Sequence, residues 1–154
     1  MRKSRQEITD NATLEEILSK QLICRLAMMD GERPYLLPFN YGYRDGYLYI
    51  HSAPEGKKID LLHRNPEVCF EVEDSVEITT GEKACDWSTR SRSVVGYGTV
   101  EILSDDKSKQ QGLEVIMAQH GAPDLTEFDP GNLKRMVILK NRITTISGKQ
   151  SSNY

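Results

Sequence analysis

The segment of this sequence with the clearest chemistry runs from Ile50 to Lys58. It has the pattern of a strand end, a tight loop and a helix start, and a helix start presents unpaired backbone N–H groups and a partial positive charge. Gly56 allows a ligand to approach the backbone, Ser52 offers a hydroxyl, and Lys57 and Lys58 add charge. Lysines in a first helical turn oppose the helix dipole unless an anion binds there. A phosphate site and a solvated lysine pair both remain open interpretations, and the spacing is not that of a P-loop.

His51 lies near the end of a strand in which side chains alternate between two faces. Tyr47 and Tyr49 share its face, whereas Ile50 and Ser52 lie on the opposite one. A face of two tyrosines and a histidine is unusually polar for a protein core. It is compatible with a planar ligand or with an amphipathic surface, and the pattern does not decide between them.

Pro38 lacks a backbone N–H group, which places it at an edge, a rim or a bulge of a sheet. The backbone around Phe39 and Asn40 is then free to face a ligand instead of a neighbouring strand. From Pro38 alone, an ordinary edge strand is the simpler interpretation.

A polar stretch later in the chain holds Cys85 and Trp87, the only tryptophan. Trp87 is compatible with a side chain that covers a pocket. A nucleophilic Cys85 would need an activating base, and the sequence shows none nearby. Arg92 and Ser93 open a long strand, either as an exposed polar start or as contacts to an anionic ligand.

The composition excludes several classes of protein. The chain has 154 residues, 38% hydrophobic and 28% charged, with a net charge of -3, which argues against a dedicated nucleic-acid binder. We expect no membrane span, because no apolar stretch is long enough, and no secretory signal, because no apolar core follows the basic residues 2–5. Cys24, Cys69 and Cys85 have no paired spacing, so we expect no disulfide framework, no metal site and a cytoplasmic location.

The elements that must position these residues follow from hydrophobic periodicity. Helices are predicted at 13–20, 57–64 and 105–119, the first with Thr13 as its N-cap. Strands are predicted at 22–29, 35–43, 47–52, 68–72, 91–103, 136–139 and 142–147. Asp45-Gly46 is the strongest hairpin signal, and Gly96 and Gly98 indicate a bulge or a barrel bend.

Successive hairpins favour antiparallel pairing, and no βαβ unit repeats. We therefore predict a mainly β protein, a small antiparallel barrel with peripheral helices. The chain is expected to form a single domain, 1–154, with flexible ends at 1–7 and 149–154. The polar segment 73–90 has no clear assignment.

Several short motifs stand in a specific order along residues 8–150. They are Pro38-Phe39-Asn40-Tyr41, Asp45-Gly46, Tyr49-Ile50-His51-Ser52-Ala53, Gly56-Lys57-Lys58, Asn65-Pro66, Val68-Cys69-Phe70, Cys85-Asp86-Trp87, the strand from Arg92 to Gly98 and Ile146-Ser147-Gly148-Lys149. This ordered set resembles the pyridoxamine 5′-phosphate oxidase-like family of FMN-binding split-barrel proteins. Within that family it is most similar to the nitroimidazole-resistance reductases.

The resemblance implies FMN as the cofactor and a split antiparallel barrel as the fold. The implied flavin contacts are Pro38, Phe39 and Asn40 at the ring, Ile50, His51 and Ser52 at the ribityl and phosphate side, Lys57 and Lys58 at the phosphate, and Arg92 or Ser93 from the next strand. The family also implies a homodimer with FMN at the subunit interface. The partner chain would complete each site, through Trp87 or the C-terminal strands.

The function implied is an FMN-dependent oxidoreductase that reduces a small acceptor, such as a nitroaromatic or a quinone, with electrons from a reduced donor. His51 matches the histidine of the nitroimidazole-resistance branch and is the candidate to hydrogen-bond the substrate or donate a proton. The oxidase proper has arginine where this chain has Tyr35, and a C-terminal substrate-binding segment that this sequence lacks. True pyridoxamine phosphate oxidation is therefore not expected. The alternative is a non-catalytic flavin- or haem-binding module, a carrier or sensor on the same barrel.

Overall fold

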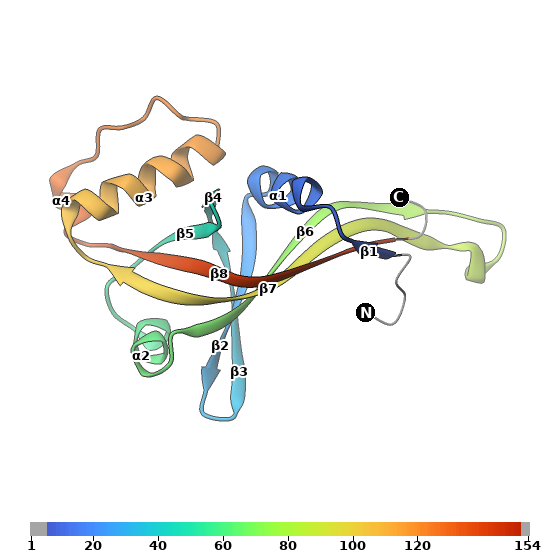
Figure 1. The fold of residues 1–154 in the computed structure, drawn as a ribbon, viewed down its shortest axis with the longest axis horizontal. Helices are drawn as coiled ribbons and strands as arrows, with labels where there is room; N and C mark the ends of the chain where they lie inside the picture. Colours follow the sequence, from blue (N-terminus) through green and yellow to red (C-terminus); the bar gives the residue numbers. More distant parts are fainter. Residues whose placement is uncertain (1–5, 152–154) are drawn as a thin grey trace.

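The computed structural model describes residues 6–151, which form one curved sheet with helices packed around it (Figure 1). The strands are β1 (Glu7–Ile8), β2 (Ile23–Asp30), β3 (Arg33–Asn40), β4 (Gly42–Arg44), β5 (Tyr47–Ser52), β6 (Glu67–Thr79), β7 (Ser88–Leu103) and β8 (Val137–Gln150). The helices are α1 (Asn11–Lys20), α2 (Lys57–Arg64), α3 (Asp106–Gln119) and α4 (Pro130–Leu133), with a 3₁₀ turn at Ala84–Asp86. In this part of the chain no helix is long and apolar enough to cross a membrane.

All strand pairs are antiparallel, and the strand order is β3-β2-β6-β7-β8-β5-β4, with β1 added to β8. The sheet is not closed, because β3 and β4 stand at the two ends of this order. It nevertheless curls far enough that Cα atoms of β3 and β5 lie within 8 Å of each other. The prediction of a mainly β, antiparallel split barrel with peripheral helices is confirmed.

The core fills the inside of this barrel. Leu26, Leu48, Phe70 and Leu139 are fully buried there, and α1 covers one end with Ile17 and Leu18. Val68, Phe70 and Val72 alternate along β6, and all three face this core. Cys24 is buried, whereas Cys69 is only partly buried because it lies on the outer face of β6.

Two sequence signals are confirmed: the hairpin turn at Asp45-Gly46 and the bulge near Gly98. Asp45 and Gly46 both have positive φ, 51° and 80°, as a type I′ hairpin turn requires. The pairing of β7 with β8 shifts register between Tyr97 and Gly98. A Cβ at Gly98 would lie 2.1 Å from Asn141 Oδ1, so only glycine fits there.

Three local predictions were wrong, and one unassigned segment forms strands. Helix α1 begins at Asn11 because the Asp10 carboxylate accepts the Thr13 amide, so Asp10, not Thr13, is the N-cap. The predicted strand 35–43 breaks at Tyr41, which turns into the core and donates its hydroxyl to the Leu18 carbonyl at 2.6 Å. The two predicted closing strands are one continuous strand, β8, because β7 pairs along its whole length. The unassigned segment 73–90 is mostly strand, since β6 and β7 continue into a long ribbon.

Part of the predicted flexible ends lies within the described residues. Glu7 pairs with Lys149, and Arg92 pairs with Gln150, so these terminal residues belong to the sheet. The remaining predicted end residues, 1–5 and 152–154, lie outside the described residues.

Helix α3 covers the outer face of β4, β5 and β8 (Figure 1). Its backbone approaches closely: a Cβ at Gly42 would lie 2.7 Å from the Ile116 Cα, and one at Gly112 would lie 2.8 Å from Ile138. Ile116, Ile138 and Leu133 are buried here, outside the barrel core. This second packing layer determines what surrounds His51.

Candidate functional site

The junction between β5 and α2 is the predicted anion site. Gly56 is the N-cap of α2, and no side chain hydrogen-bonds to this helix start. Its φ of +106° is accessible to glycine, and a Cβ added there would meet nothing within 4 Å. The start of α2 therefore opens onto free space with uncapped backbone N–H groups. This arrangement suits a phosphate.

The two lysines at this junction differ. The Lys57 ammonium lies 2.7 Å from Asp30 Oδ2 and 4.6 Å from the centre of the Tyr35 ring. The hydrogen bond to Asp30 raises the pKa of Lys57, and the same bond lowers the pKa of the Asp30 carboxyl. Lys58 has no ion pair with any residue from 6 to 151. Lys58 is therefore the more available cation for a bound anion.

Two strand edges at the split of the barrel are unpaired. β3 pairs only with β2, so the edge that carries Phe39 and Asn40 is open, as Pro38 predicted. β4 pairs with β5 only as far as Tyr49, so among the described strands residues 50–52 pair with β8 alone. The split of the barrel thus lies between two segments that the sequence predicts as flavin contacts.

The side chains of these two segments point in different directions. Phe39 packs partly against the core, whereas Pro38 and Asn40 are exposed on the outer face. Ile50 and Ser52 face the barrel interior, and the Ser52 hydroxyl donates to the Ala53 carbonyl at 2.9 Å. For Ile50, which is fully buried, only the backbone is left to contact a ligand.

His51 points the opposite way, toward α3. It lines a cavity of about 440 Å³ together with Leu113 and Met117 of α3 and Glu127, Phe128 and Met136 of the segment that follows. Tyr47 and Tyr49 of the same face are not part of that cavity. Their rings instead lie 4.4 and 5.9 Å from the Lys140 ammonium.

Arg92 already has acidic partners within the chain. Its guanidinium donates to the Asp74 carboxylate, with Nε at 2.8 Å from Oδ2, and lies 3.8 Å from Glu16. Gln21 donates to the other oxygen of Asp74 at 2.8 Å. Both members of the Arg92–Asp74 pair are largely buried, so the pair joins α1, β6 and β7. Its geometry is that of a structural ion pair.

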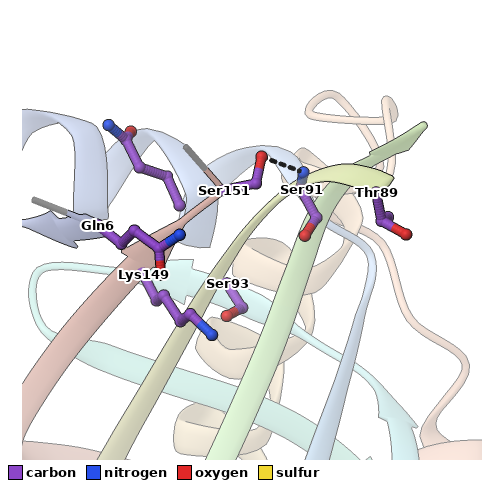
Figure 2. Close-up of a pocket in the computed structure, with 7 residues that line it drawn as sticks. Gln6, Thr89, Ser91, Ser93, Lys149 and Ser151 are labelled. Carbon is purple, nitrogen blue, oxygen red and sulfur yellow. Dashed lines mark hydrogen bonds between the residues drawn. The ribbon is translucent and has the colours of Figure 1, made fainter. Parts of the chain in front are cut away.

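Ser93 lies in a separate polar pocket on the outer face of the sheet (Figure 2). The pocket is lined by Gln6, Thr89, Ser91, Ser93, Lys149, Gln150 and Ser151. The Ser91 amide donates to the Ser151 hydroxyl at 3.2 Å, drawn as the dashed line in Figure 2. With hydroxyls, amides and one ammonium group but no carboxylate, the lining is chemically suited to an oxyanion.

Trp87 follows the 3₁₀ turn between β6 and β7. The ribbon formed by β6 and β7 extends to the opposite end of the molecule from α2 (Figure 1). Its side chain is 55% exposed, and its indole N–H donates to the Gly81 carbonyl at 2.9 Å. Within one chain, β5 and α2 bring residues 50–52 and the two lysines together, and β3 approaches β5. Phe39 and Asn40 lie at the other end of the β2–β3 hairpin from Asp30 and Tyr35, which Lys57 contacts. Trp87 stands apart from the two lysines.

Sequence reasoning missed two features of this region. The ion pair of Lys57 with Asp30 joins residues 27 positions apart, and no local pattern indicates such a contact. The cavity beside His51 is built by one face of α3 together with α4 and the residues next to it, and the sequence did not predict α4. Within residues 6–151 no cluster of three or more histidine, cysteine, aspartate or glutamate side chains is placed to hold a metal ion.

Comparisons with known proteins agree on one group. The family model described as pyridoxamine 5′-phosphate oxidase matches residues 10–150. A putative 5-nitroimidazole antibiotic resistance protein from Bacteroides thetaiotaomicron is 30% identical, with a TM-score of 0.83 over 94% of this chain and 86% of that one. A comparison with curated proteins gave no match.

Two further solved structures have the same fold. An FAD-binding protein from Mesorhizobium loti is 25% identical, with a TM-score of 0.68 over 93% of this chain and 96% of that one. The FAD and haem binding protein from Mycobacterium smegmatis is 20% identical, with a TM-score of 0.84 over 96% and 74%.

Proposed function

We propose that this chain, which belongs to the pyridoxamine 5′-phosphate oxidase family, is an FMN-dependent oxidoreductase that reduces a small acceptor such as a nitroaromatic or a quinone. The observation that carries the proposal is the start of α2, an uncapped, glycine-led helix that follows the open strand edge at residues 50–52. It carries Lys58, which has no ion pair within residues 6–151. The similarity to a nitroimidazole resistance protein supports a reductive reaction.

The residues present fit a flavin with a terminal phosphate. Lys58 and the N–H groups at the start of α2 would hold the phosphate, with Lys57 as a second cation. The open edge of β3 at Phe39 and Asn40 would hold the ring through backbone groups. When bound, FMN supplies the electron transfer, and the protein binds and orients it. His51, which faces away from the barrel core, would hold or donate a proton on the acceptor side.

We also propose a homodimer that covers the outer face of the sheet. Leu36, Ala27, Cys69 and Tyr97 pair in sequence across β3, β2, β6 and β7, so they form one row on that face. Leu36 is 57% and Tyr97 59% exposed, at the two ends of this row, which leaves an apolar surface open on that face.

The predicted site supports the same arrangement. Pro38 and Asn40 lie on the outer face, and Ser93 opens onto it in the pocket of Figure 2. A second chain on this face would bring its own residues to each flavin, and Trp87 or the C-terminal strands are the proposed contributors. We propose a cytoplasmic location, supported by three cysteines that form no disulfide.

The experiment is anaerobic reduction of the FMN-loaded protein. Bleaching of the flavin by NADH or NADPH, followed by reoxidation on adding a nitroaromatic or a quinone, is the expected result. The His51→Gln variant should keep its flavin but reoxidise more slowly, by about a hundredfold if His51 supplies the proton. A flavin that stays oxidised with every donor would indicate a carrier or sensor instead, and a Soret band would indicate haem.

A further inference from the structure

The cavity beside His51 is separate from the start of α2. Side chains alternate along β5, so Ile50 and Ser52 face the barrel core while His51 faces α3. No residue of α2 lines the cavity. At about 440 Å³ it falls within the range of small-molecule pockets. Apart from His51, its lining residues come from α3, from α4 and from the residues next to α4.

The lining of the cavity is mostly apolar and adaptable. Leu113, Met117, Phe128 and Met136 are all only partly buried, so their surfaces are available to a ligand. Methionine side chains adjust to flat molecules, and a phenylalanine ring offers a stacking surface. These residues favour a ligand that contains an aromatic ring.

Two polar groups at the cavity give it a preferred charge. Neither the His51 imidazole nor the Glu127 carboxylate has a hydrogen bond or ion pair with any other residue from 6 to 151. Asp129 and Asn132 are the other polar residues of the lining, and the Asp129 carboxylate already accepts the Asn132 backbone N–H at 2.9 Å. Two carboxylates and no lysine or arginine line the cavity, so an anionic ligand is disfavoured.

We propose that this cavity is a binding site for a small aromatic compound that is neutral or cationic. The ring lies among Met117, Phe128 and Met136, a polar substituent reaches His51, and a positive group lies toward Glu127. The proposal of a binding site depends only on the residues that line the cavity. The use of this cavity for the electron acceptor of the reaction rests on the proposed function.

The experiment uses three probes of similar shape and different charge: indole, tryptamine and indole-3-acetate. Each is titrated into the full chain labelled with ¹³C at the methionine methyl groups. We expect the Met117 and Met136 resonances to shift, with Met28 in the core and Met29 at the far end of β2 as internal controls. Tryptamine should bind about fivefold more tightly than indole-3-acetate.

Two variants test the assignment. Glu127→Gln should reduce the preference for tryptamine over indole-3-acetate to less than about twofold. Leu113→Trp should fill the cavity and abolish the shifts, whereas Leu125→Trp, on an exposed position of the neighbouring segment, should leave them intact. The Glu127→Gln variant keeps the test decisive if Leu113→Trp does not fold, because it changes charge at an exposed position.

The same titration with saturating FMN separates this proposal from the proposed function. Unchanged tryptamine binding supports a distinct site. Displacement of tryptamine by FMN would overturn the proposal, as would shifts at neither Met117 nor Met136, or equal affinity for the cationic and anionic probes. A protein that retains no FMN but gives the expected methyl shifts would overturn the proposed function alone.

Discussion

The Lys57 ammonium nitrogen lies 2.7 Å from the Asp30 carboxylate, which ties the start of α2 to the end of β2. Lys57 therefore already has an acidic partner, and its ring contact with Tyr35 fixes it further. Lys58, the next residue, has no such partner within residues 6–151. The two adjacent lysines have the same predicted role, but the charge of Lys57 is shared with Asp30 whereas that of Lys58 is not.

This difference predicts unequal effects of removing the two lysines. Lys58→Ala should weaken FMN binding by about tenfold or more, the size of a lost hydrogen bond to a charged group. Lys57→Ala should weaken it less, because that cation is shared with Asp30. Titration with FMN and with riboflavin, which has no phosphate, measures the effect. Neither variant should change riboflavin affinity, and equal losses for both flavins would contradict a phosphate anchor at this helix start.

Replacing Asp30 by asparagine should have the opposite effect. Asp30→Asn removes a competing carboxylate and releases Lys57, so we expect FMN to bind about two- to fivefold more tightly, the range of an exposed ion pair. Isothermal titration with FMN tests this. Weaker binding in Asp30→Asn would mean that the pair positions Lys57 for the ligand instead of competing with it.

The same pair predicts a pH dependence of stability. The hydrogen bond from Lys57 lowers the pKa of the Asp30 carboxyl below 3.8. A carboxyl with a lowered folded pKa stabilises the fold above its unfolded pKa, and this contribution is lost as pH falls through the folded value. The stability difference between the wild type and Asp30→Asn should therefore be constant above about pH 5 and vanish in stronger acid. Urea unfolding from pH 3 to 7 measures it.

The exposed row on the outer face predicts a self-associating protein. Tyr97→Arg should convert a homodimer into a monomer, because it places a charge in the centre of an apolar contact. Leu125→Lys is the matched control, since Leu125 is equally exposed but lies in the segment after α3. Sedimentation velocity distinguishes the two states. A wild-type chain that is monomeric at micromolar concentration would contradict the proposed dimer.

The bulge in β7 predicts a large cost at Gly98. In Gly98→Ala the new methyl would lie 2.1 Å from Asn141 Oδ1 and 2.7 Å from the Arg142 carbonyl oxygen. Because both neighbours are held in β8, we expect a loss of about 1–3 kcal/mol in the free energy of unfolding. Urea denaturation gives the value, and Ser104→Ala, at an exposed position, should change it little. A Gly98→Ala chain as stable as the wild type would mean that the strand relaxes freely here.

Much of the fold could be predicted because its signals are local. The Asp45-Gly46 turn, β5 and α2 all follow from residue type and spacing, and their bounds agree with the structure. The position of Tyr41 could not be predicted from local signals. This residue sits in an apparently continuous strand, yet its hydroxyl bonds to the Leu18 carbonyl and the strand breaks there. Contacts of this kind depend on the packing of distant segments.

The same limit applies to the candidate site. The start of α2 and the open edge at Pro38 could be predicted, because each depends on one short segment. Arg92 could not be assigned from its strand, since its burial depends on Asp74 and Glu16 from other elements. The direction of His51 followed from strand alternation, but the cavity it enters depends on how α3 packs across β5.

The most direct test of the central claim is an absorption spectrum of the purified protein, taken after incubation with excess FMN and desalting. The account predicts flavin bands that remain with the protein in the wild type and are lost or much reduced in Lys58→Ala. A colourless wild-type protein would contradict the account. If Lys58→Ala retained as much FMN as the wild type, the phosphate would have to bind elsewhere.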